Sequence, residues 1–455
     1  MHKTIALFSG LILALASCLT LHFLGFDFHL SVTVFVAVLC VIWWLFEPVP
    51  IPITSLIPLA VFQLTGTLDK HVIGASYGSP LILLLLGGFI LSKAMESSGA
   101  HKRLAVFMIR LFGKHSSRGL LLGFMASTAL LSMWISNTAT TLMMLPVALA
   151  ILAEKNDLKL AIPLMLGIAW SASIGGLGTP IGTPANLVFM QVYNDNAGAE
   201  LGFSDWMHFG IPTVLFMIII AWAWLGRSLT YNGGFQLPDM GKWSAYEKRV
   251  IWVFAITAFL WITRTEPFGG WRGLLNIPAN DASVALLSVV AMFMIPNGQG
   301  EKLLNWEKAQ QIPWGVLLLF GGGICLAKAF SASGLSDHLA HALSGITVLP
   351  TVIAVCLIAL FVTFLTETTS NTATTVLLMP VLAATALSAD MNPEVLMVPA
   401  VLSASCAFMM PVATAPNSIV MGSGLVKTRD MARNGVVLNL LGTAVITMVV
   451  WLVVL

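Results

Sequence analysis

Two identical motifs of hydroxyl and amide side chains, Ser-Asn-Thr-Ala-Thr-Thr, interrupt apolar stretches of this chain. They lie at 136–141 and 370–375, and each is followed five residues later by a proline, Pro146 or Pro380. Because Ser and Asn are favoured helix N-caps, each motif predicts a helical tip at which a new helix begins. The free N–H groups and positive dipole end of such a helix suit an anion. We therefore expect the two tips to face each other across an anion site.

A second pair of motifs shares the same chemistry. Thr-Pro-Ala-Asn at 183–186 and Thr-Ala-Pro-Asn at 414–417 each place a proline inside an apolar run. Proline lacks an N–H and so frees an upstream carbonyl, which predicts a broken helix. Hydroxyl, amide and carbonyl oxygens are ligands that suit hard cations. A sodium ion held between each tip and its neighbouring break is the simplest interpretation.

None of these four motifs contains Arg or Lys. A carboxylate buried in a membrane protein needs compensating charge, and bound cations would supply it. Without the cations the anion site has only dipoles, and without the anion the cation-filled site is costly to move. The motifs therefore predict that an anion and sodium ions move together.

The motifs belong to an internal repeat. The stretch from Gly87 to Ala105 also matches Gly322 to Ala340. Together with the two pairs of motifs above, this gives three matching pairs of segments in register. We assign residues 1–78 to N-terminal scaffold helices and 208–313 to connecting helices. The first repeat spans 79–207, with a hairpin at 120–153 and a broken helix at 161–193. The second spans 314–455, with a hairpin at 348–390, a broken helix at 394–425 and a last helix.

The composition indicates that these elements lie in a membrane. Of 455 residues 58% are hydrophobic and 9% are charged, with a mean hydropathy of +0.91, whereas soluble chains carry about 25% charged residues. The prediction is an all-α polytopic membrane protein with about eleven transmembrane helices and two re-entrant hairpins. The expected spans are 5–24, 30–47, 50–66, 79–98, 161–193, 208–226, 249–264, 283–296, 314–331, 394–425 and 435–454.

Several other classes of protein are disfavoured. A net charge of +2 gives no basic surface for nucleic acid. The five cysteines lack the spacing of a disulfide or zinc framework, and no catalytic motif of a membrane enzyme is present. Residues 15–18 resemble a lipoprotein cleavage site, but another apolar span follows at once, so we interpret this segment as the first transmembrane helix.

The basic residues predict the orientation. With the N-terminus in the cytoplasm, 17 of the 22 Lys and Arg residues fall in cytoplasmic connections, as the positive-inside rule requires. The first repeat then begins on a span that runs inward and the second on one that runs outward. Inverted repeats with matched polar interruptions are typical of secondary carriers. The expected location is a bacterial inner membrane.

These residues resemble the divalent anion/sodium symporter family, whose bacterial members include sodium-dependent dicarboxylate transporters. The likeness rests on the paired tips and breaks and extends to the contexts 131–135 and 314–323. It implies a homodimer, an elevator motion of a transport domain against a scaffold, and transport of a small dicarboxylate with sodium ions. Many relatives have Thr-Pro-Pro-Asn at the second break, so Ala415 bears on the pocket shape and the substrate size.

The resemblance also implies a role for individual residues. One sodium ion would be held by Ser132, Ser136, Asn137 and the Gly182 carbonyl. A second sodium ion would be held by Thr366, Thr369, Asn371 and the Ala413 carbonyl. The substrate carboxylates would contact Asn137, Thr138, Thr183, Asn371, Thr372 and Thr414.

Some alternatives remain at this point. A channel would usually build its pore from several subunits. An anion exchanger of the same fold would carry dicarboxylates or tricarboxylates without sodium, although the intact Asn137 and Asn371 favour the symporter. Glu367 is an ionisable group inside the second hairpin. Because its repeat mate is Met133, a structural role for Glu367 is favoured over direct binding of a cation or proton.

Overall fold

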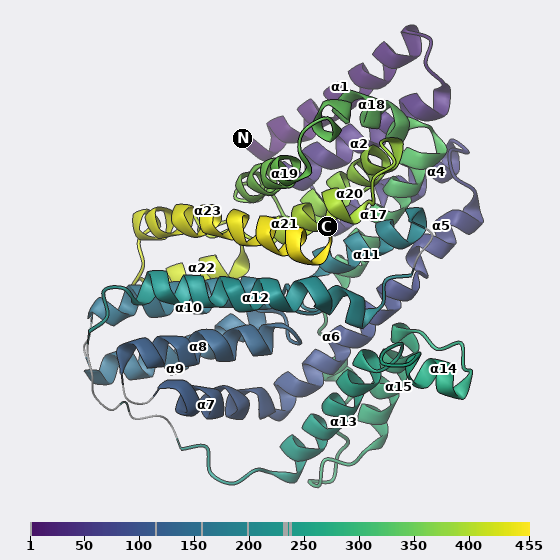
Figure 1. Cartoon of the computed structure of the whole chain (residues 1–455). Helices are drawn as coiled ribbons and strands as arrows, with labels where there is room; N and C mark the ends of the chain where they lie inside the picture. Colours follow the sequence, from purple (N-terminus) through teal and green to yellow (C-terminus); the bar gives the residue numbers. More distant parts are fainter. Residues whose placement is uncertain (1, 114–115, 156–157, 198–199, 231–234, 236–238) are drawn as a thin grey trace.

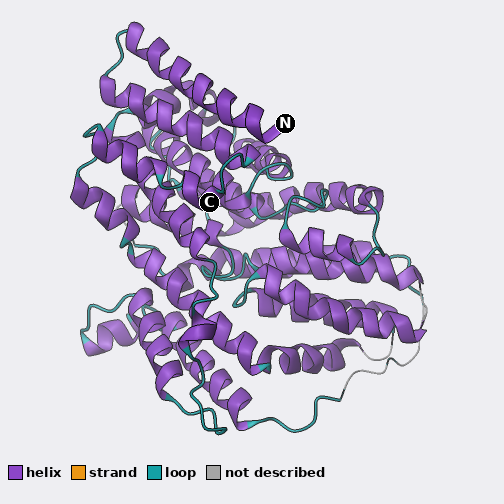
Figure 2. Cartoon of the chain, turned by 180° about the vertical axis from the view of Figure 1, so that it is seen from behind, coloured by secondary structure: helices purple, strands orange, loops and turns teal. Residues whose placement is uncertain are grey.

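The computed structural model describes residues 2–113, 116–155, 158–197, 200–230, 235 and 239–455. Within these ranges the chain forms 23 helices and no strand, apart from one isolated bridge pair, Pro296 with Lys302 (Figure 2). The chain begins with five helices, which are α1 (His2–Phe23), α2 (Phe28–Phe46), α3 (Ile51–Thr54), α4 (Ile57–Leu64) and α5 (Lys70–Tyr77).

The ends of α2 follow from local chemistry. Asp27 caps its first turn, with a carboxylate oxygen 2.8 Å from the His29 N–H. At its C-terminal end, Glu47 adopts a left-handed conformation with φ of 46°, and its backbone N–H donates to the Trp43 carbonyl. Two prolines follow at 48 and 50, so the helix cannot continue. Glu47 therefore lies directly at the C-terminal end of α2.

Two later segments contain the same series of seven helices. The first comprises α6 (Pro80–Ser98), α7 (Ala100–Gly113), α8 (Ser117–Ser132), α9 (Asn137–Lys155), α10 (Leu158–Gly175), α11 (Pro184–Asn196) and α12 (Phe203–Gly226). The second comprises α17 (Trp314–Ala332), α18 (Leu335–Thr347), α19 (Thr351–Leu365), α20 (Asn371–Ser388), α21 (Glu394–Ala404), α22 (Ala415–Gly422) and α23 (Thr428–Val453). They are joined through α13 (Ala245–Ile262), α14 (Gly270–Leu275), α15 (Asp281–Met294) and α16 (Trp306–Ala309).

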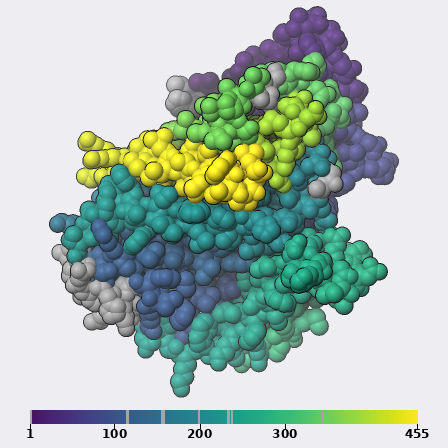
Figure 3. All heavy atoms as spheres, in the orientation of Figure 1, coloured from purple at the N-terminus to yellow at the C-terminus, as the bar shows by residue number. Residues whose placement is uncertain are grey.

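The prediction of an all-α polytopic membrane protein is confirmed. Within the described residues, seven helical segments are long and apolar enough to cross a bilayer: α1, α2, α5 with α6, α12, α17, α20 and α23. Other predicted spans fall on shorter or split helices, such as 161–193 on α10 and α11. The first helix exposes large apolar side chains, including Ile5, Phe8 and Ile12, and protrudes from the molecule (Figure 3). Such a helix is suited to lipid.

The two segments interlock through their split helices. The α11 helix of the first segment packs on α20 and α21 of the second, and α22 of the second packs on α9 and α10 of the first (Figure 1). Glycines permit close contact at the splits. A Cβ at Gly175 would lie 2.3 Å from the Ala129 carbonyl oxygen, and one at Gly435 would lie 2.2 Å from that of Phe408. Each segment therefore supplies part of the other's core.

The surroundings of the two hairpins differ. The α7 helix packs mainly on α8, the first arm of the first hairpin. Its counterpart α18 packs mainly on α20, the second arm of the other hairpin. The segments therefore share their order of helices and other contacts, such as α8 with α10 and α19 with α21, but α7 and α18 pack on different arms of their hairpins.

Candidate functional site

Both duplicated motifs form the tips of helical hairpins. The first tip joins α8 to α9, and the Ser136 hydroxyl accepts a hydrogen bond from the Ala139 N–H at 3.3 Å. The second tip joins α19 to α20, and the Ser370 hydroxyl accepts one from the Ala373 N–H at 3.5 Å. Each serine thus caps the helix that begins at the next residue, Asn137 or Asn371.

The proline motifs lie at the helix breaks. The first break separates α10 from α11, with Thr183 extended just before the second helix. The second break separates α21 from α22, and the Thr414 hydroxyl accepts from the Asn417 N–H at 3.3 Å. In both places the proline occupies one of the first two helical positions, where its missing N–H costs nothing.

The asparagines of these motifs hold the breaks together. The buried Asn186 amide donates to the carbonyls of Gly176 and Thr179 at 2.9 and 2.8 Å. Asn417 repeats the pattern with Ala407 and Met410, both at 3.0 Å. A non-helical loop inside apolar surroundings would otherwise leave these carbonyls without donors. Asn186 and Asn417 therefore have a structural role that is the same in both repeats.

The first tip brings together several oxygen atoms of the first repeat. The Ser132 hydroxyl oxygen lies 2.7 Å from both Asn137 Oδ1 and the Ala172 carbonyl oxygen. Since a hydroxyl has one proton, it can donate to only one of these acceptors. A Cβ at Gly176 would lie 2.9 Å from Asn137 Oδ1 and 3.2 Å from the Gly182 carbonyl oxygen, so these two atoms flank one point. The oxygens of Ser132, Asn137 and Ala172 thus share one hydroxyl proton, and the Gly182 carbonyl oxygen lies near the Asn137 amide.

At the second tip, Thr366 repeats the contacts that Ser132 makes at the first. The Thr366 hydroxyl oxygen lies 2.7 Å from Asn371 Oδ1 and 2.8 Å from the Ala404 carbonyl oxygen. The Thr369 hydroxyl is within 2.9 Å of the Leu365 carbonyl oxygen. Clusters of oxygen acceptors that lack protons suit a hard cation. Of the residues expected at this site, Thr366 and Asn371 are in direct contact.

One cavity unites the residues expected to bind the substrate. A cavity of about 470 Å³ lies between the two tips and the two breaks. It is also lined by Thr369 and Ala413 of the expected second sodium site, by Trp44 of α2 and by Glu47, which directly follows α2. All six expected substrate residues line it: Asn137, Thr138, Thr183, Asn371, Thr372 and Thr414.

A second cavity, of about 800 Å³, lies on the other side of the first tip. It reaches from Ser136, Asn137 and Thr183 to Lys93, Glu96, His101 and Lys102 at the α6–α7 corner. Lys93 pairs with Glu96 at 2.8 Å. Burial lowers the pKa of His101, so positive charge in this cavity comes mainly from the lysines.

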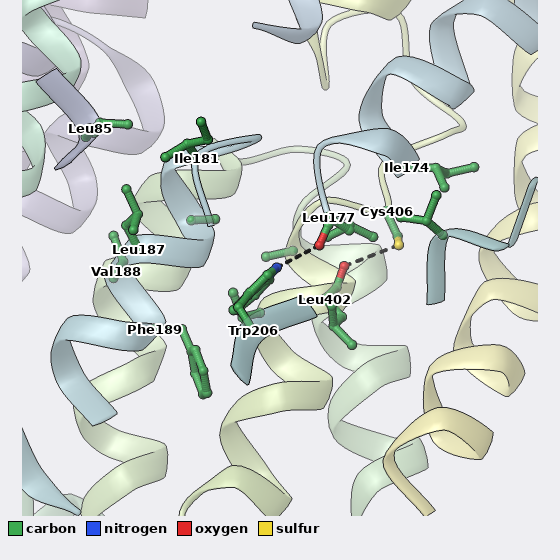
Figure 4. Close-up of a cluster of buried hydrophobic side chains, with 14 of the residues drawn as sticks. Leu85, Ile174, Leu177, Ile181, Leu187, Val188, Phe189, Trp206, Leu402 and Cys406 are labelled. Atoms are coloured by element: carbon green, nitrogen blue, oxygen red, sulfur yellow. Dashed lines mark hydrogen bonds between the residues drawn. The ribbon is translucent and has the colours of Figure 1, made fainter. Parts of the chain in front are cut away.

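A buried apolar cluster packs against both helix breaks. The Trp206 indole of α12 donates to the Leu177 carbonyl at 2.7 Å. Figure 4 shows this pair in one cluster with Cys406 of the second break and Leu402 of α21. The rings of Trp170 and Phe408 also meet across the two repeats, with centroids 5.8 Å apart. The breaks are therefore anchored to each other as well as to their own helices.

Comparison with known proteins matches the chain, over residues 5–455, to the family described as the sodium:sulfate symporter transmembrane region. The chain belongs to this family. The sodium-dependent dicarboxylate transporter SdcS of Staphylococcus saprophyticus is 39% identical over 453 residues, covering 94% of this chain and 86% of the relative. The protein of that name from Staphylococcus aureus strain USA300 is 38% identical over 449 residues, covering 93% and 85%.

The fold also resembles a solved structure. The YdaH transporter of Alcanivorax borkumensis superimposes with a TM-score of 0.59 over 84% of this chain and 88% of that chain. Sequence identity in that comparison is 14%, so the likeness concerns the fold alone. The family membership shows that the chain is a transporter and not an enzyme.

Sequence reasoning missed some residues around the two tips. The carbonyls of Ala172 and Ala404 contact the hydroxyls of the two oxygen clusters, yet a backbone carbonyl has no signature in one sequence. A signal was nevertheless present. Both alanines lie in a Ser-Ala-Ser motif, at 171–173 and 403–405, in register with the repeat. Trp44 and Glu47 were missed because α2 lies outside both repeats.

Glu367 has the structural role that was favoured from the sequence. Its side chain is buried and accepts hydrogen bonds from the N–H groups of Phe408, Met409 and Met410, which form the second break. The Asn439 amide of α23 donates a fourth bond, at 2.8 Å. The carboxylate therefore ties the second tip to the second break and to the last helix.

Proposed function

We propose that this chain imports small C4-dicarboxylates, such as succinate, malate and fumarate, by sodium symport across the inner membrane of a bacterium. The observation that carries this proposal is the 470 Å³ cavity lined by all six polar residues expected to hold the substrate. Two helix N-termini, at Asn137 and Asn371, begin at its wall. Their N–H groups and dipoles suit the two carboxylates of such a substrate.

The charges in this cavity support coupling to cations. Its lining contains two carboxylates, Glu47 and Glu367, and no Lys, Arg or His among the described residues. A dicarboxylate would bring two further negative charges into a region of low dielectric, where repulsion between like charges is strong. Sodium ions at the two oxygen clusters offset that charge. An exchanger without sodium would have no comparable compensation in this cavity.

The relatives support the same choice of ions. Both staphylococcal relatives are named sodium-dependent dicarboxylate transporters and align with more than nine tenths of this chain. The proposed ligands of the first sodium ion are Ser132, Ser136, Asn137 and the Gly182 carbonyl, to which we add the Ala172 carbonyl. Those of the second are Thr366, Thr369, Asn371 and the Ala413 carbonyl, to which we add the Ala404 carbonyl.

Movement follows from the duplicated architecture. We propose that segments 79–207 and 314–455 are inverted repeats, with α12, which extends beyond residue 207, as the counterpart of α23. We also propose that the hairpins and split helices move as an elevator within a homodimer. With the N-terminus in the cytoplasm, the 800 Å³ cavity beside Lys93, Glu96 and Lys102 opens to the cytoplasm. The structure then represents an inward-facing state, in which the substrate leaves past these residues.

The decisive experiment is uptake of labelled succinate into proteoliposomes with and without an inward sodium gradient. The proposal expects saturable uptake that requires external sodium and that unlabelled succinate, malate or fumarate competes away. Uptake that ignores sodium but is accelerated by internal dicarboxylate would instead identify an exchanger. Transport of sulfate alone would refute the assigned substrate class.

A further inference from the structure

We propose that the adjoining ends of α12 and α23 bind the headgroup of an anionic phospholipid. The headgroup site consists of Arg227, which directly follows α12, and Arg433 in the second turn of α23. With the N-terminus in the cytoplasm, as proposed above, both residues lie at the cytoplasmic surface of the membrane. Neither the two oxygen clusters nor the cavity between the tips takes part, so this site is separate from the proposed transport function.

Arg227 is held in a fixed orientation. Its guanidinium carbon lies 3.6 Å from the centroid of the Trp224 ring. One N–H group donates to the Trp224 carbonyl, and another donates to Asn434 Oδ1 at 3.4 Å. A guanidinium has five N–H donors, so the others remain for a ligand. Because its planar edge matches two oxygens of a phosphate, an arginine oriented in this way is suited to a phosphate group.

A second arginine lies beside it without a carboxylate to pair with. Asn434 of α23 accepts from the Trp224 indole at 3.2 Å as well as from Arg227, and it directly follows Arg433. Partial burial lowers the pKa of Arg227, and the nearby charge of Arg433 lowers it further. Within the part of the chain that the structure describes, neither arginine forms an ion pair. Two like charges held close together repel each other, and an anion between them would relieve that repulsion.

The flanking charges are mainly positive. Arg429 lies four residues before Arg433, on the same face of α23, and is exposed. Lys427 is exposed just before the helix. The carboxylate of Asp430 accepts from the Lys427 backbone N–H at 3.3 Å, as expected of an acidic group in the first turn of a helix. Basic residues therefore outnumber acidic ones at the start of α23, which favours an anion there.

Arg118 of α8 joins this end of α12 to the first hairpin. Its Nε atom donates to the Gly226 carbonyl at 2.8 Å, and another nitrogen donates to the Arg227 carbonyl at 3.2 Å. The Trp222 indole donates in return to the Arg118 carbonyl at 2.9 Å. These bonds satisfy carbonyls at the end of α12 and add a third arginine close to the headgroup site. A headgroup bound at Arg227 therefore lies next to the first arm of the first hairpin.

Exposed apolar side chains continue from the charges along both helices. On α12, Leu215 and Ile219 are exposed and precede Arg227 at multiples of four residues, which places all three on one face. On α23, the exposed Leu440 follows Arg433 by two helical turns, on the same face. The two helices pack side by side at the surface (Figure 3). A strip with charge at one end and apolar side chains beyond it fits a phospholipid better than a soluble phosphate compound.

The test counts phospholipids bound to the purified chain by native mass spectrometry. It compares dioleoylphosphatidylglycerol, which is anionic, with dioleoylphosphatidylcholine, which has the same acyl chains and no net charge. We expect phosphatidylglycerol to bind about tenfold or more tightly, since each basic residue near a headgroup favours an anionic lipid. In R227Q/R433Q this preference should fall to within about twofold.

A matched control separates the site from general surface charge. K242Q/K248Q also removes two positive charges, from exposed positions beside the start of α13, and should keep the preference of the unmodified chain. R433Q alone should reduce the preference by about threefold to fivefold. Because the Arg433 side chain is exposed, this variant should fold normally.

Two results would overturn the proposal: an equal loss of preference in K242Q/K248Q and R227Q/R433Q, or an unchanged preference in both R433Q and R227Q/R433Q. Displacement of phosphatidylglycerol by soluble glycerol phosphate would also overturn it, because the site would then bind a free phosphate compound. None of these measurements involves transport, so sodium-independent uptake would bear on the proposed function alone.

Discussion

The hydroxyl of Thr366 offers a sharp test of the second sodium site. Thr366→Val keeps the shape of the side chain and removes the oxygen that lies 2.7 Å from Asn371 Oδ1 and 2.8 Å from the Ala404 carbonyl. Thr363 provides a matched control, since it lies in α19 about one turn earlier. Both side chains are fully buried, but the Thr363 hydroxyl has no hydrogen-bond partner.

The expected magnitudes follow from these contacts. Thr366→Val removes one hydrogen bond and leaves a buried acceptor unsatisfied, so the free energy of unfolding should fall by about 1–3 kcal/mol. The loss of one sodium ligand should raise the sodium concentration for half-maximal uptake by roughly 10- to 100-fold, equivalent to about 1.4–2.8 kcal/mol. Thr363→Val removes a hydroxyl that has no bond, and should leave stability unchanged or raise it slightly.

The assay combines sodium activation of succinate uptake in proteoliposomes with thermal unfolding of the same preparations. Thr366→Val should show weakened sodium activation at saturating succinate, and Thr363→Val should match the unmodified protein. If both variants shift sodium activation alike, the effect comes from the helix and not from a ligand. If neither shifts it, Thr366 does not contact sodium and the geometry has been misread.

Three other predictions concern the motifs and the close packing. Asn417→Leu removes two amide bonds to break carbonyls at 3.0 Å and should cost about 2–4 kcal/mol of unfolding free energy; an unchanged melting temperature would argue against its structural role. Gly175→Ala places a methyl 2.3 Å from a carbonyl oxygen of α8 and should destabilise by at least about 1–3 kcal/mol, whereas Gly345→Ala meets open space and should stabilise by up to about 1 kcal/mol. Asn137→Ala and Asn371→Ala should each abolish uptake while the protein elutes as a folded species; normal uptake in both would remove the site assignment.

Duplication explains why so much of the site could be expected from the sequence. One Ser-Asn-Thr motif alone is ambiguous, because hydroxyl side chains often bond to their own helix. Two identical copies in register predicted two tips, and the structure brings both to one cavity. The proline motifs predicted breaks for a local reason, since proline removes a backbone donor wherever it stands.

Other features had no duplicated signal. Glu367 has no acidic counterpart in the first repeat, and its three backbone donors become visible only when the break loop is folded against the tip. The packing of α7 on α8 and of α18 on α20 could not be inferred from matching sequences, which predict matching contacts. The approach of α2 to the cavity depends on tertiary packing between segments that share no motif.

The wall that α2 contributes to the cavity has a practical consequence. Trp44 and Glu47 stand against the tips without belonging to either hairpin. If the hairpin tips move during transport and α2 does not, a compound that binds both the tips and α2 would prevent that movement. Such a compound would hold the protein in a single conformation. Its selectivity among relatives would depend on the few residues of α2 that it contacts. If the proposed elevator motion is right, an inhibitor could bind where α2 meets the tips without using the substrate's own contacts.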